Sequence, residues 1–236
     1  MAHFTINSLI VGTHTILAAY AGDSTFDGSS ASPLGQQVNP NYTTTVLSSD
    51  MSSSHYTQVV TITATVAPSG TPVSGPAGWV IFFQNGVFLA QRQVIDGVAT
   101  LATSAMAVGD QWITATYQGD GIFEGSSADP IEQTVISNST TTTLVSSLDP
   151  SSSGEDVTFT ATVAPSGTPV IGPASGWTIF YDNGSYLSQA QLDSSGIATF
   201  TTSSLSVGTH IITASYQGDG TFDASWSDPL TQTVLA

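Results

Sequence analysis

The sequence contains no cysteine and no lysine, and Arg92 is its only residue of the Lys and Arg class. Without cysteine, the chain can form no disulfide, use no thiol in catalysis and bind no metal through sulfur. Its 17 acidic residues give a formal net charge of -16, although charged residues make up only 8% of the chain. This balance argues against binding to nucleic acid or anionic membranes, which attract cationic surfaces.

Long hydrophobic runs are also missing from the sequence. No stretch reaches 18 apolar residues, so we expect no membrane-spanning helix and no membrane insertion. The opening Met-Ala-His-Phe lacks the basic and apolar regions of a signal peptide, so any export signal is expected outside this chain. Hydrophobic residues still make up 40% of the chain, which is enough to build packed cores.

An internal repeat organises the chain. Residues 63–73 and 160–170 both read TATVAPSGTPV, and residues 113–135 closely resemble residues 212–234 and 16–38. Repeats of this kind predict an array of similar structural units.

The repeats divide the chain into three predicted parts, of which two are complete repeats and one is incomplete. Residues 40–138 and 139–236 each contain a whole repeat, whereas residues 1–39 contain only the last strands of one. The linkers between the parts are short, and short linkers limit bending. We therefore expect the parts to form an extended rod.

Each repeat has the pattern of β-strands. In residues 60–66 and 157–163 apolar residues alternate with threonine, which is typical of half-buried strands. Asn85-Gly86 and Asn183-Gly184 follow short apolar runs and predict tight hairpins, because both residue types tolerate positive φ. No segment shows helical periodicity with caps. The strand number and turn spacing predict an all-β fold of tandem immunoglobulin-like β-sandwiches.

A family resemblance supports this interpretation. The pattern GTH-x-I-x-A-x-Y-x-GD-x-x-F, with the upstream VTFTATVAPSG and FYDNG segments, resembles the bacterial Ig-like repeats of large surface and secreted proteins. The resemblance covers nearly the whole chain. It implies an extracellular or cell-surface location and a role as a stalk, spacer or adhesive module. We expect no cofactor.

Nothing in the sequence points to catalysis. His14 and His210 occupy equivalent repeat positions, but Gln111 replaces them in the middle copy. A general base replaced by glutamine is better interpreted as a surface or half-buried residue at the start of a strand. No paired carboxylates recur around a cleft, and no nucleophile motif precedes a helix. We therefore expect no enzyme activity.

The Gly-Asp turns are weak candidates for calcium binding. Each turn carries two acidic residues, and the candidate ligands in the two complete repeats are Asp120, Glu124, Asp219 and Asp223. Calcium takes six to eight oxygen ligands, usually from several carboxylates. The sequence favours the simpler interpretation that the aspartate binds the backbone of its own turn.

Three Asn-x-Ser/Thr sequons begin at Asn41, Asn138 and Asn183. Asn41 and Asn138 occupy the same linker position, and Asn183 lies in a hairpin turn. We expect all three to be exposed, as glycosylation requires. They are candidate sites, although such sequons arise easily in a chain rich in Ser and Thr.

The aromatic residues are the strongest candidates for an interaction surface. Residues 79–83 and 177–181 are apolar at both strand parities, so either the tryptophans or Phe82 and Phe180 face the core. In the second case the tryptophan parity forms an exposed stripe, and such patches mark interaction sites. Trp226 has serine at the equivalent positions and is expected in an exposed loop. The candidates are Trp79, Ile81, Phe83, Trp112, Trp177 and Trp226.

The function expected from the sequence is structural: a non-catalytic repeat segment of an extracellular stalk, adhesin or filament. Association with other copies of the chain through the incomplete N-terminal repeat would extend this role. The alternative is a module that binds carbohydrate or protein through its exposed aromatic residues.

Overall fold

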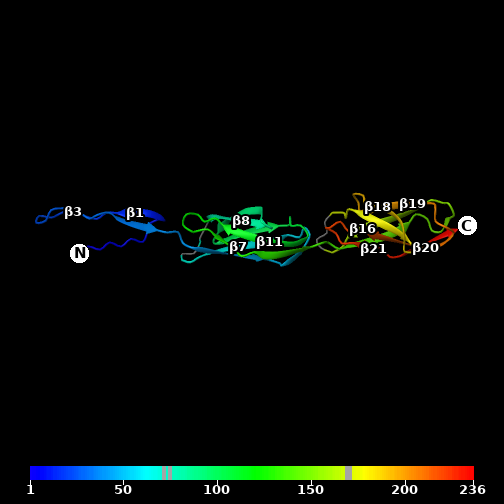
Figure 1. Ribbon diagram of the computed structural model, residues 1–236, viewed down its shortest axis with the longest axis horizontal. Coiled ribbons are helices and arrows are strands. Elements are labelled where there is room, and N and C mark those ends of the chain that lie inside the picture. The colour runs from blue at the N-terminus through cyan, green and yellow to red at the C-terminus, as the bar shows by residue number, and fades with distance from the viewer. Residues whose placement is uncertain (71–72, 74–75, 168–171) are drawn as a thin grey trace. The chain divides into compact units, whose positions relative to one another are not determined.

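The computed structural model describes residues 1–70, 73, 76–167 and 172–236 (Figure 1). The ends of the TATVAPSGTPV repeats, residues 71–72 and 168–170, lie outside this part of the chain. The described residues form strands and turns without a helix, which confirms the predicted all-β fold. Among them, no helix is therefore long and apolar enough to cross a membrane.

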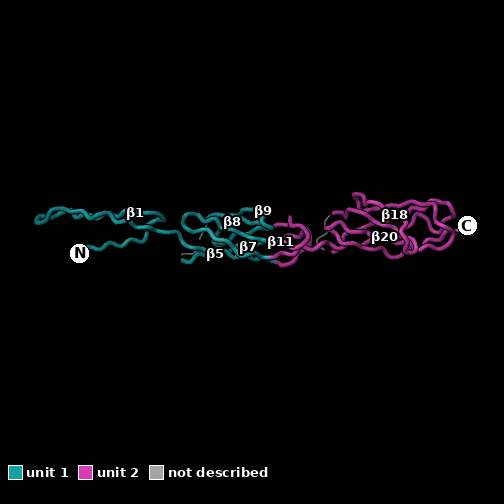
Figure 2. The backbone as a smooth tube through the Cα atoms, viewed as in Figure 1, with its two compact units in different colours: residues 1–50, 61–102, 112–131 teal, residues 51–60, 103–111, 132–236 magenta. Residues whose placement is uncertain are grey.

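The chain divides into two compact units (Figure 2). Unit 1 comprises residues 1–50, 61–102 and 112–131, and unit 2 comprises residues 51–60, 103–111 and 132–236. The division into parts 1–39, 40–138 and 139–236 follows the repeats and stays a prediction.

Unit 1 contains most of the strands that come early in the chain. They are β1 (Gly12–Ile16), β2 (Ala19–Tyr20), β3 (Ser29–Ser30), β4 (Leu34–Val38), β5 (Thr43–Ser49), β7 (Val60–Pro68), β8 (Pro76–Gln84), β9 (Val87–Ile95), β10 (Val98–Thr103), β11 (Gly109–Tyr117) and β12 (Ser126–Ser127). The first residue of β7, the last residue of β10 and residues 109–111 of β11 fall in unit 2. Strands β5-β7-β10-β9-β8-β11 follow one another in hydrogen-bonded order, and β12 pairs with β11. Strands β1 and β4 form a separate two-stranded sheet, as do β2 and β3.

Unit 2 contains β6, all of β13 except Ile131, and the strands of the C-terminal sandwich. They are β6 (Ser53–His55), β13 (Ile131–Ile136), β14 (Thr140–Ser146), β15 (Ser151–Ser152), β16 (Val157–Pro165), β17 (Trp177–Asp182), β18 (Ser185–Gln191), β19 (Ile197–Thr202), β20 (Gly208–Tyr216), β21 (Ser225–Trp226) and β22 (Leu230–Leu235). One sheet has the order β14-β16-β19, and the other has the order β15-β22-β20-β17-β18 with β21 beside β20.

The core of the C-terminal sandwich comes from the inward-facing residues of both sheets. Strand β16 contributes Val157, Phe159, Ala161 and Val163, because alternate residues of a strand point to the same face. Phe180 of β17 is fully buried, and its ring centroid lies 5.9 Å from that of Phe200. The alternation of apolar residues with threonine therefore marks the core face.

The predicted Asn-Gly hairpins are present. Gln84 pairs with Val87 and Asp182 pairs with Ser185, which leaves two-residue loops. Asn85 and Asn183 have φ values of 50° and 49°, and the following glycines are also positive. These angles are those that a two-residue loop needs to match the twist of its strands.

Two short strand pairs run parallel. Strand β13 pairs with β6 from Thr134↔Ser53 to Ile136↔His55, and β15 pairs with β22 at Ser151↔Val234 and Ser152↔Leu235. Every other pair of named strands with a described register in the two units is antiparallel, from the β1–β4 pair to the β20–β22 pair.

We expect the folded chain to resist trypsin. Arg92 offers the one cleavage site, and it lies within β9, where it pairs with Val80 of β8. A protease needs an extended, unpaired segment, so cleavage requires local opening of this strand pair. Gel electrophoresis of native digests should show an intact chain, whereas the urea-unfolded chain should be cut into two fragments. Rapid native cleavage would show that β9 is not stably paired.

Candidate functional site

The exposed face of β8 and β17 carries the candidate tryptophans. Trp79 is 45% exposed and Trp177 is 47% exposed, whereas Phe82 and Phe180 are fully buried. Phe82 pairs with Ala115 and Phe180 with Ala214, both of which are buried on neighbouring strands. The interpretation that places the tryptophans in the core is therefore wrong, and the phenylalanine parity fills the core.

In unit 1, Ile81 and Phe83 share the outer face of β8 with Trp79 and are half-buried. Phe83 pairs with Thr114 of β11, and Trp112, two residues earlier on that strand, is 51% exposed. Phe83 also pairs with Phe88 of β9, which is 62% exposed. Phe88 was not among the residues predicted from the sequence, although its place after the Asn-Gly turn could have indicated it.

In unit 2, the outer face of β17 carries a stacked aromatic pair. The ring centroids of Tyr181 and Trp226 are 5.4 Å apart, with an interplanar angle of 27°. Trp226 was expected in a loop, but it lies in β21 and pairs with Ser215 of β20. Its side chain is still 60% exposed. Trp226 thus offers a flat aromatic surface to solvent beside the half-buried Tyr181, and the contact with Tyr181 was not predicted.

The aspartates of the Gly-Asp turns bind their own backbone. Asp120 accepts hydrogen bonds from the N–H groups of Ile122 and Phe123, both at 2.9 Å. Asp219 accepts the same bonds from Thr221 and Phe222, also at 2.9 Å. This geometry matches the turn interpretation. No group of three or more His, Asp or Glu side chains that could hold a metal occurs among the described residues.

The other acidic candidates lie beside these turns. The backbone N–H of Glu124 donates to the carbonyl of Asn41, and that of Asp223 donates to the carbonyl of Asn138, both at 2.8 Å. The carboxylate of Asp223 accepts a hydrogen bond from the hydroxyl of Ser137. These contacts join each turn to the segment that precedes its own repeat.

As the pH is lowered from neutral, we expect the stability of unit 2 to begin to fall only below about pH 4, the ordinary range of a carboxyl group. Burial alone raises the pKa of Asp219, but bonds from Ser175, Thr221 and Phe222 outweigh it and lower the pKa to about 2. A lowered pKa stabilises the fold above the unfolded value of 3.8, and this contribution is lost as pH falls through the folded value. In acid unfolding followed by circular dichroism, the stability of Asp219→Asn should depend less steeply on pH than that of the unaltered chain. The exposed control Asp228→Asn should leave this pH dependence unchanged.

A histidine–aspartate pair links β20 to β17. The Nδ1 atom of His210 lies 2.8 Å from the carboxylate of Asp182, and its Nε2 atom lies 2.9 Å from the carbonyl oxygen of Ser206. The side chain of His210 is only 8% exposed, so it is more buried than the surface or half-buried position that the sequence predicts. Both ring nitrogens face acceptors, an arrangement that the protonated imidazolium satisfies by donating twice.

This pairing predicts a pH-dependent contribution to stability. Burial by itself lowers the pKa of His210, but the bonds to Ser206 and Asp182 outweigh it and raise the pKa above 6.5. The stabilisation is complete below pH 6.5 and is lost as pH rises through the folded pKa. In an NMR titration, Asp182→Asn should lower the pKa of His210, and Asp228→Asn should leave it unchanged. An unaltered titration in Asp182→Asn would show that the carboxylate does not hold the proton.

The structure corrects the expected exposure of one sequon. Asn138 is only 3% exposed, because its side-chain amide donates to the carbonyl of Tyr56 at 3.2 Å. Its backbone forms an isolated bridge with Phe222. Asn41 forms the equivalent bridge with Phe123 and is half-buried, whereas Asn183 is exposed. Of the three, Asn183 is the sequon best placed for glycosylation.

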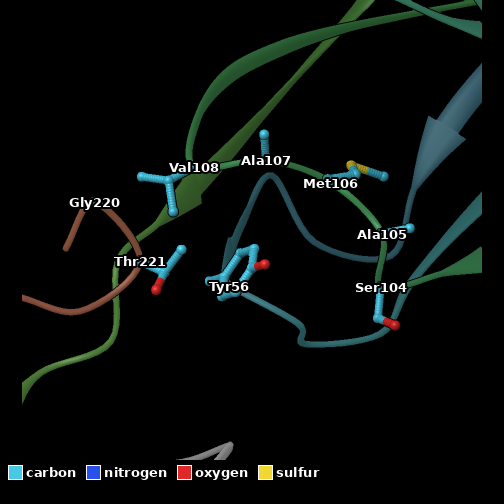
Figure 3. Close-up of a pocket in the computed structure, with 8 residues that line it drawn as sticks. All are labelled: Tyr56, Ser104, Ala105, Met106, Ala107, Val108, Gly220 and Thr221. Atoms are coloured by element: carbon cyan, nitrogen blue, oxygen red, sulfur yellow. The ribbon is translucent and has the colours of Figure 1, made fainter. Parts of the chain in front are cut away.

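A cavity of about 570 Å³ lies within unit 2 (Figure 3). It is lined by Tyr56, Thr221, Gly220 and the segment 104–108, which includes Met106. In Figure 3 the ring of Tyr56 lies between this segment and Thr221. The lining carries no charged side chain.

Comparison with known proteins supports the fold. The sequence pattern of the family described as "Bacterial Ig-like domain (group 3)" matches residues 47–136 and 142–235. No curated protein matches the chain in sequence.

Three similar solved structures come from different bacteria. The fibronectin(III)-like modules of Clostridium thermocellum CbhA are 15% identical, with a TM-score of 0.34, and the match covers 81% of this chain and 94% of that one. The Yersinia pseudotuberculosis adhesin InvE is 16% identical, with a TM-score of 0.43 and coverage of 80% and 58%. The Escherichia coli adhesin FdeC is 16% identical, with a TM-score of 0.33 and coverage of 81% and 64%.

Proposed function

Because the chain belongs to the bacterial Ig-like domain family, group 3, we propose that it is a non-catalytic structural segment of an extracellular or cell-surface stalk, adhesin or filament. The observation that carries this proposal is the tandem arrangement of two family domains, separated only by residues 137–141. Asn138 lies in this linker, and its backbone and side chain bind Thr221 and Tyr56 respectively. A linker held by hydrogen bonds on both sides suits a spacer.

Location on the cell surface is the first consequence to test. Antibodies raised against the chain should label intact, unpermeabilised cells of the source organism in immunogold electron microscopy. An antibody against a cytoplasmic protein serves as the control for cell integrity. Labelling that appears only after permeabilisation would contradict a surface role.

A second candidate function is carbohydrate binding through the Tyr181–Trp226 pair. Sugar rings stack on flat aromatic surfaces, and in this assembled pair the ring of Trp226 is exposed while Tyr181 is half-buried. The net charge of -16 favours neutral glycans over anionic ones. In a glycan array, Trp226→Ser, which copies Ser127 of the preceding repeat, should abolish binding. Trp112→Ser removes a tryptophan from unit 1 and should leave this binding unchanged.

A finer proposal concerns association with other copies of the chain. The N-terminal hairpin exposes large apolar side chains, among them Leu17, Phe26 and Leu34, each more than 60% exposed. Packing such faces together, head to tail or side by side, would bury them and build a fibre. Light scattering across a concentration series should then show growth in mass, and a constant monomer mass would contradict self-association.

A further inference from the structure

Trp226 occupies a position where the other repeats carry a serine. The equivalent residues are Ser30 and Ser127. Trp226 pairs with Ser215 of β20, and Ser127 pairs in the same way with Thr116 of β11. The exchange of serine for tryptophan thus leaves the strand pairing unchanged. The fold of the repeat does not need a large aromatic residue here, so the exposed indole is available for another role.

The strands around this position are held by the same hydrogen bonds in both complete repeats. In the C-terminal sandwich, the hydroxyl of Thr142 lies 2.7 Å from that of Ser225. In the middle repeat, the hydroxyls of Thr45 and Ser126 are also 2.7 Å apart. These bonds join β14 to β21 and β5 to β12, and they form with or without the tryptophan. We call this arrangement the threonine–serine frame.

In the C-terminal sandwich, the threonine–serine frame borders a cavity of about 330 Å³. The cavity is lined by residues 140–143 of β14, by Ser225 and Trp226 of β21 and by Asp228. The stack with Tyr181 covers one face of the indole and leaves the other face to solvent. The volume is near the lower end of the usual range for ligand cavities, about 300–1,000 Å³, so it suits a ligand of one small ring.

The polar side chains of the lining offer hydrogen-bond acceptors. The exposed carboxylate of Asp228 can only accept. The hydroxyl of Thr143 donates to the carbonyl of Thr162 at 3.5 Å, so its oxygen offers lone pairs to a ligand. The hydroxyl of Thr140 donates to the carbonyl of Asp223 at 2.8 Å. A ligand that matches these groups must donate hydrogen bonds and present an apolar face to the indole.

A second lining position changes together with Trp226. Thr143 corresponds to Val46 of the middle repeat, whereas Asp228 corresponds to Asp129. The repeat that carries the tryptophan thus also has an additional hydroxyl beside the same cavity, while the acidic residue is common to both repeats. A stacking surface and a hydrogen-bonding group appear together, as a binding site requires.

A neutral sugar ring has the matching groups. The C–H groups on one face of a pyranose stack on an aromatic ring, and its hydroxyls donate from the edge. An acidic sugar matches less well, because the net charge of -16 and the carboxylate of Asp228 repel an anion. A quaternary ammonium ion is bound by a cage of aromatic rings, whereas Trp226 is the one aromatic residue among the described residues of the lining.

We propose that the cavity between β14 and β21 is a subsite for one neutral hexopyranose ring, which stacks on Trp226 and donates hydrogen bonds to Asp228 and Thr143. The ring carries at least two adjacent free hydroxyls, because two neighbouring donors match the two oxygens of one carboxylate. This inference rests on the proposed carbohydrate binding by the Tyr181–Trp226 pair, which it narrows to one class of sugar and one side of the indole.

The test is an NMR titration of the full chain with small probes of one ring or less. The neutral probes are the methyl pyranosides of glucose, galactose and mannose, and the charged probes are methyl glucuronide and choline. We expect at least one neutral probe to shift the amide resonances of residues 140–143 and 225–228. Neither charged probe should shift them.

Single substitutions assign the contacts. Trp226→Ser should abolish the shifts and keep the fold, since serine is the residue of the middle repeat. Asp228→Asn should weaken binding about tenfold, in line with a lost hydrogen bond to a charged group, and Thr143→Val about threefold, in line with a neutral one. Asp129→Asn removes the equivalent carboxylate of the middle repeat and should leave the affinity unchanged.

The middle repeat offers a gain-of-function test. Val46→Thr together with Ser127→Trp gives it both residues that distinguish the C-terminal lining, and Phe83 is present at the position equivalent to Tyr181. With the same neutral probe, this double variant should show additional shifts at residues 43–46. Their absence would show that the two positions do not complete the subsite and would overturn the proposal.

The site of the shifts separates this proposal from the broader one. Shifts around Tyr186 and Trp177 that vanish with Trp226→Ser, but are insensitive to Asp228→Asn and Thr143→Val, would keep carbohydrate binding and overturn the cavity subsite. Binding of glucuronide or choline in place of the neutral probes would overturn the assigned ligand class. No shift with any probe would overturn both the subsite and carbohydrate binding, whereas immunogold labelling decides the surface role independently.

Discussion

Phe180→Ala is expected to lower the free energy of unfolding of the C-terminal sandwich by about 3–5 kcal/mol, the usual cost of removing a buried aromatic ring. Phe180 is fully buried, pairs with Ala214 and lies against Phe200. The substitution leaves a cavity between the two sheets that the surrounding strands can close only in part. A loss of this size is a large share of the total stability of a domain, typically about 5–15 kcal/mol.

Trp177→Ala provides the matched control, because this residue lies on the same strand but on the outer face. It is 47% exposed, so its removal should change the unfolding free energy by less than about 1 kcal/mol. Urea unfolding followed by circular dichroism measures both variants. A larger loss for Trp177→Ala than for Phe180→Ala would reverse the assignment of the core face.

Gln232→Leu is expected to cost about 2–4 kcal/mol, because each buried polar group left unpaired costs about 1–3 kcal/mol. The side chain of Gln232 is fully buried within the C-terminal sandwich. Its Oε1 accepts a hydrogen bond from Ser146 at 2.6 Å, and its Nε2 donates to the carbonyl of Leu148 at 2.9 Å. Nε2 also lies 3.3 Å from the hydroxyl of Ser151. Leucine has a similar size but can form none of these hydrogen bonds, so the partner groups would lose them.

Gln36→Leu is the natural comparison for this substitution. Gln36 occupies the same register position in the N-terminal hairpin, but it is exposed, and its amide donates a hydrogen bond to the adjacent carbonyl of Gln37. Differential scanning calorimetry should show an unchanged sandwich transition for Gln36→Leu and a lower melting temperature for Gln232→Leu. Equal melting temperatures for the two variants would show that the buried amide network adds no net stability.

The fold was largely predictable from local patterns. Alternation of apolar residues with threonine in residues 60–66 and 157–163 depends only on the period of a strand, and it gave the correct core face. The turns at Asn85 and Asn183 follow from backbone angles that few residue types adopt. Such signals are local, so a single sequence contains them in full.

The candidate site was less predictable because it depends on neighbours distant in the sequence. Residues 79–83 are apolar at both parities, so the pattern alone could not decide between Trp79 and Phe82 for the core. The prediction that Asn138 is exposed was wrong because its hydrogen-bond partner, Tyr56, lies in the preceding repeat. The stacking of Trp226 on Tyr181 likewise requires the pairing of β21 with β20.

The two parallel strand pairs have a consequence for a protein that carries tension. When the ends of a domain are pulled apart along parallel strands, the hydrogen bonds between them are sheared together instead of being unzipped one by one. The β6–β13 pair has three register positions, and the β15–β22 pair has two. Under a rising load the β15–β22 pair should therefore rupture first, and the C-terminal domain would extend while the β6–β13 pair still holds.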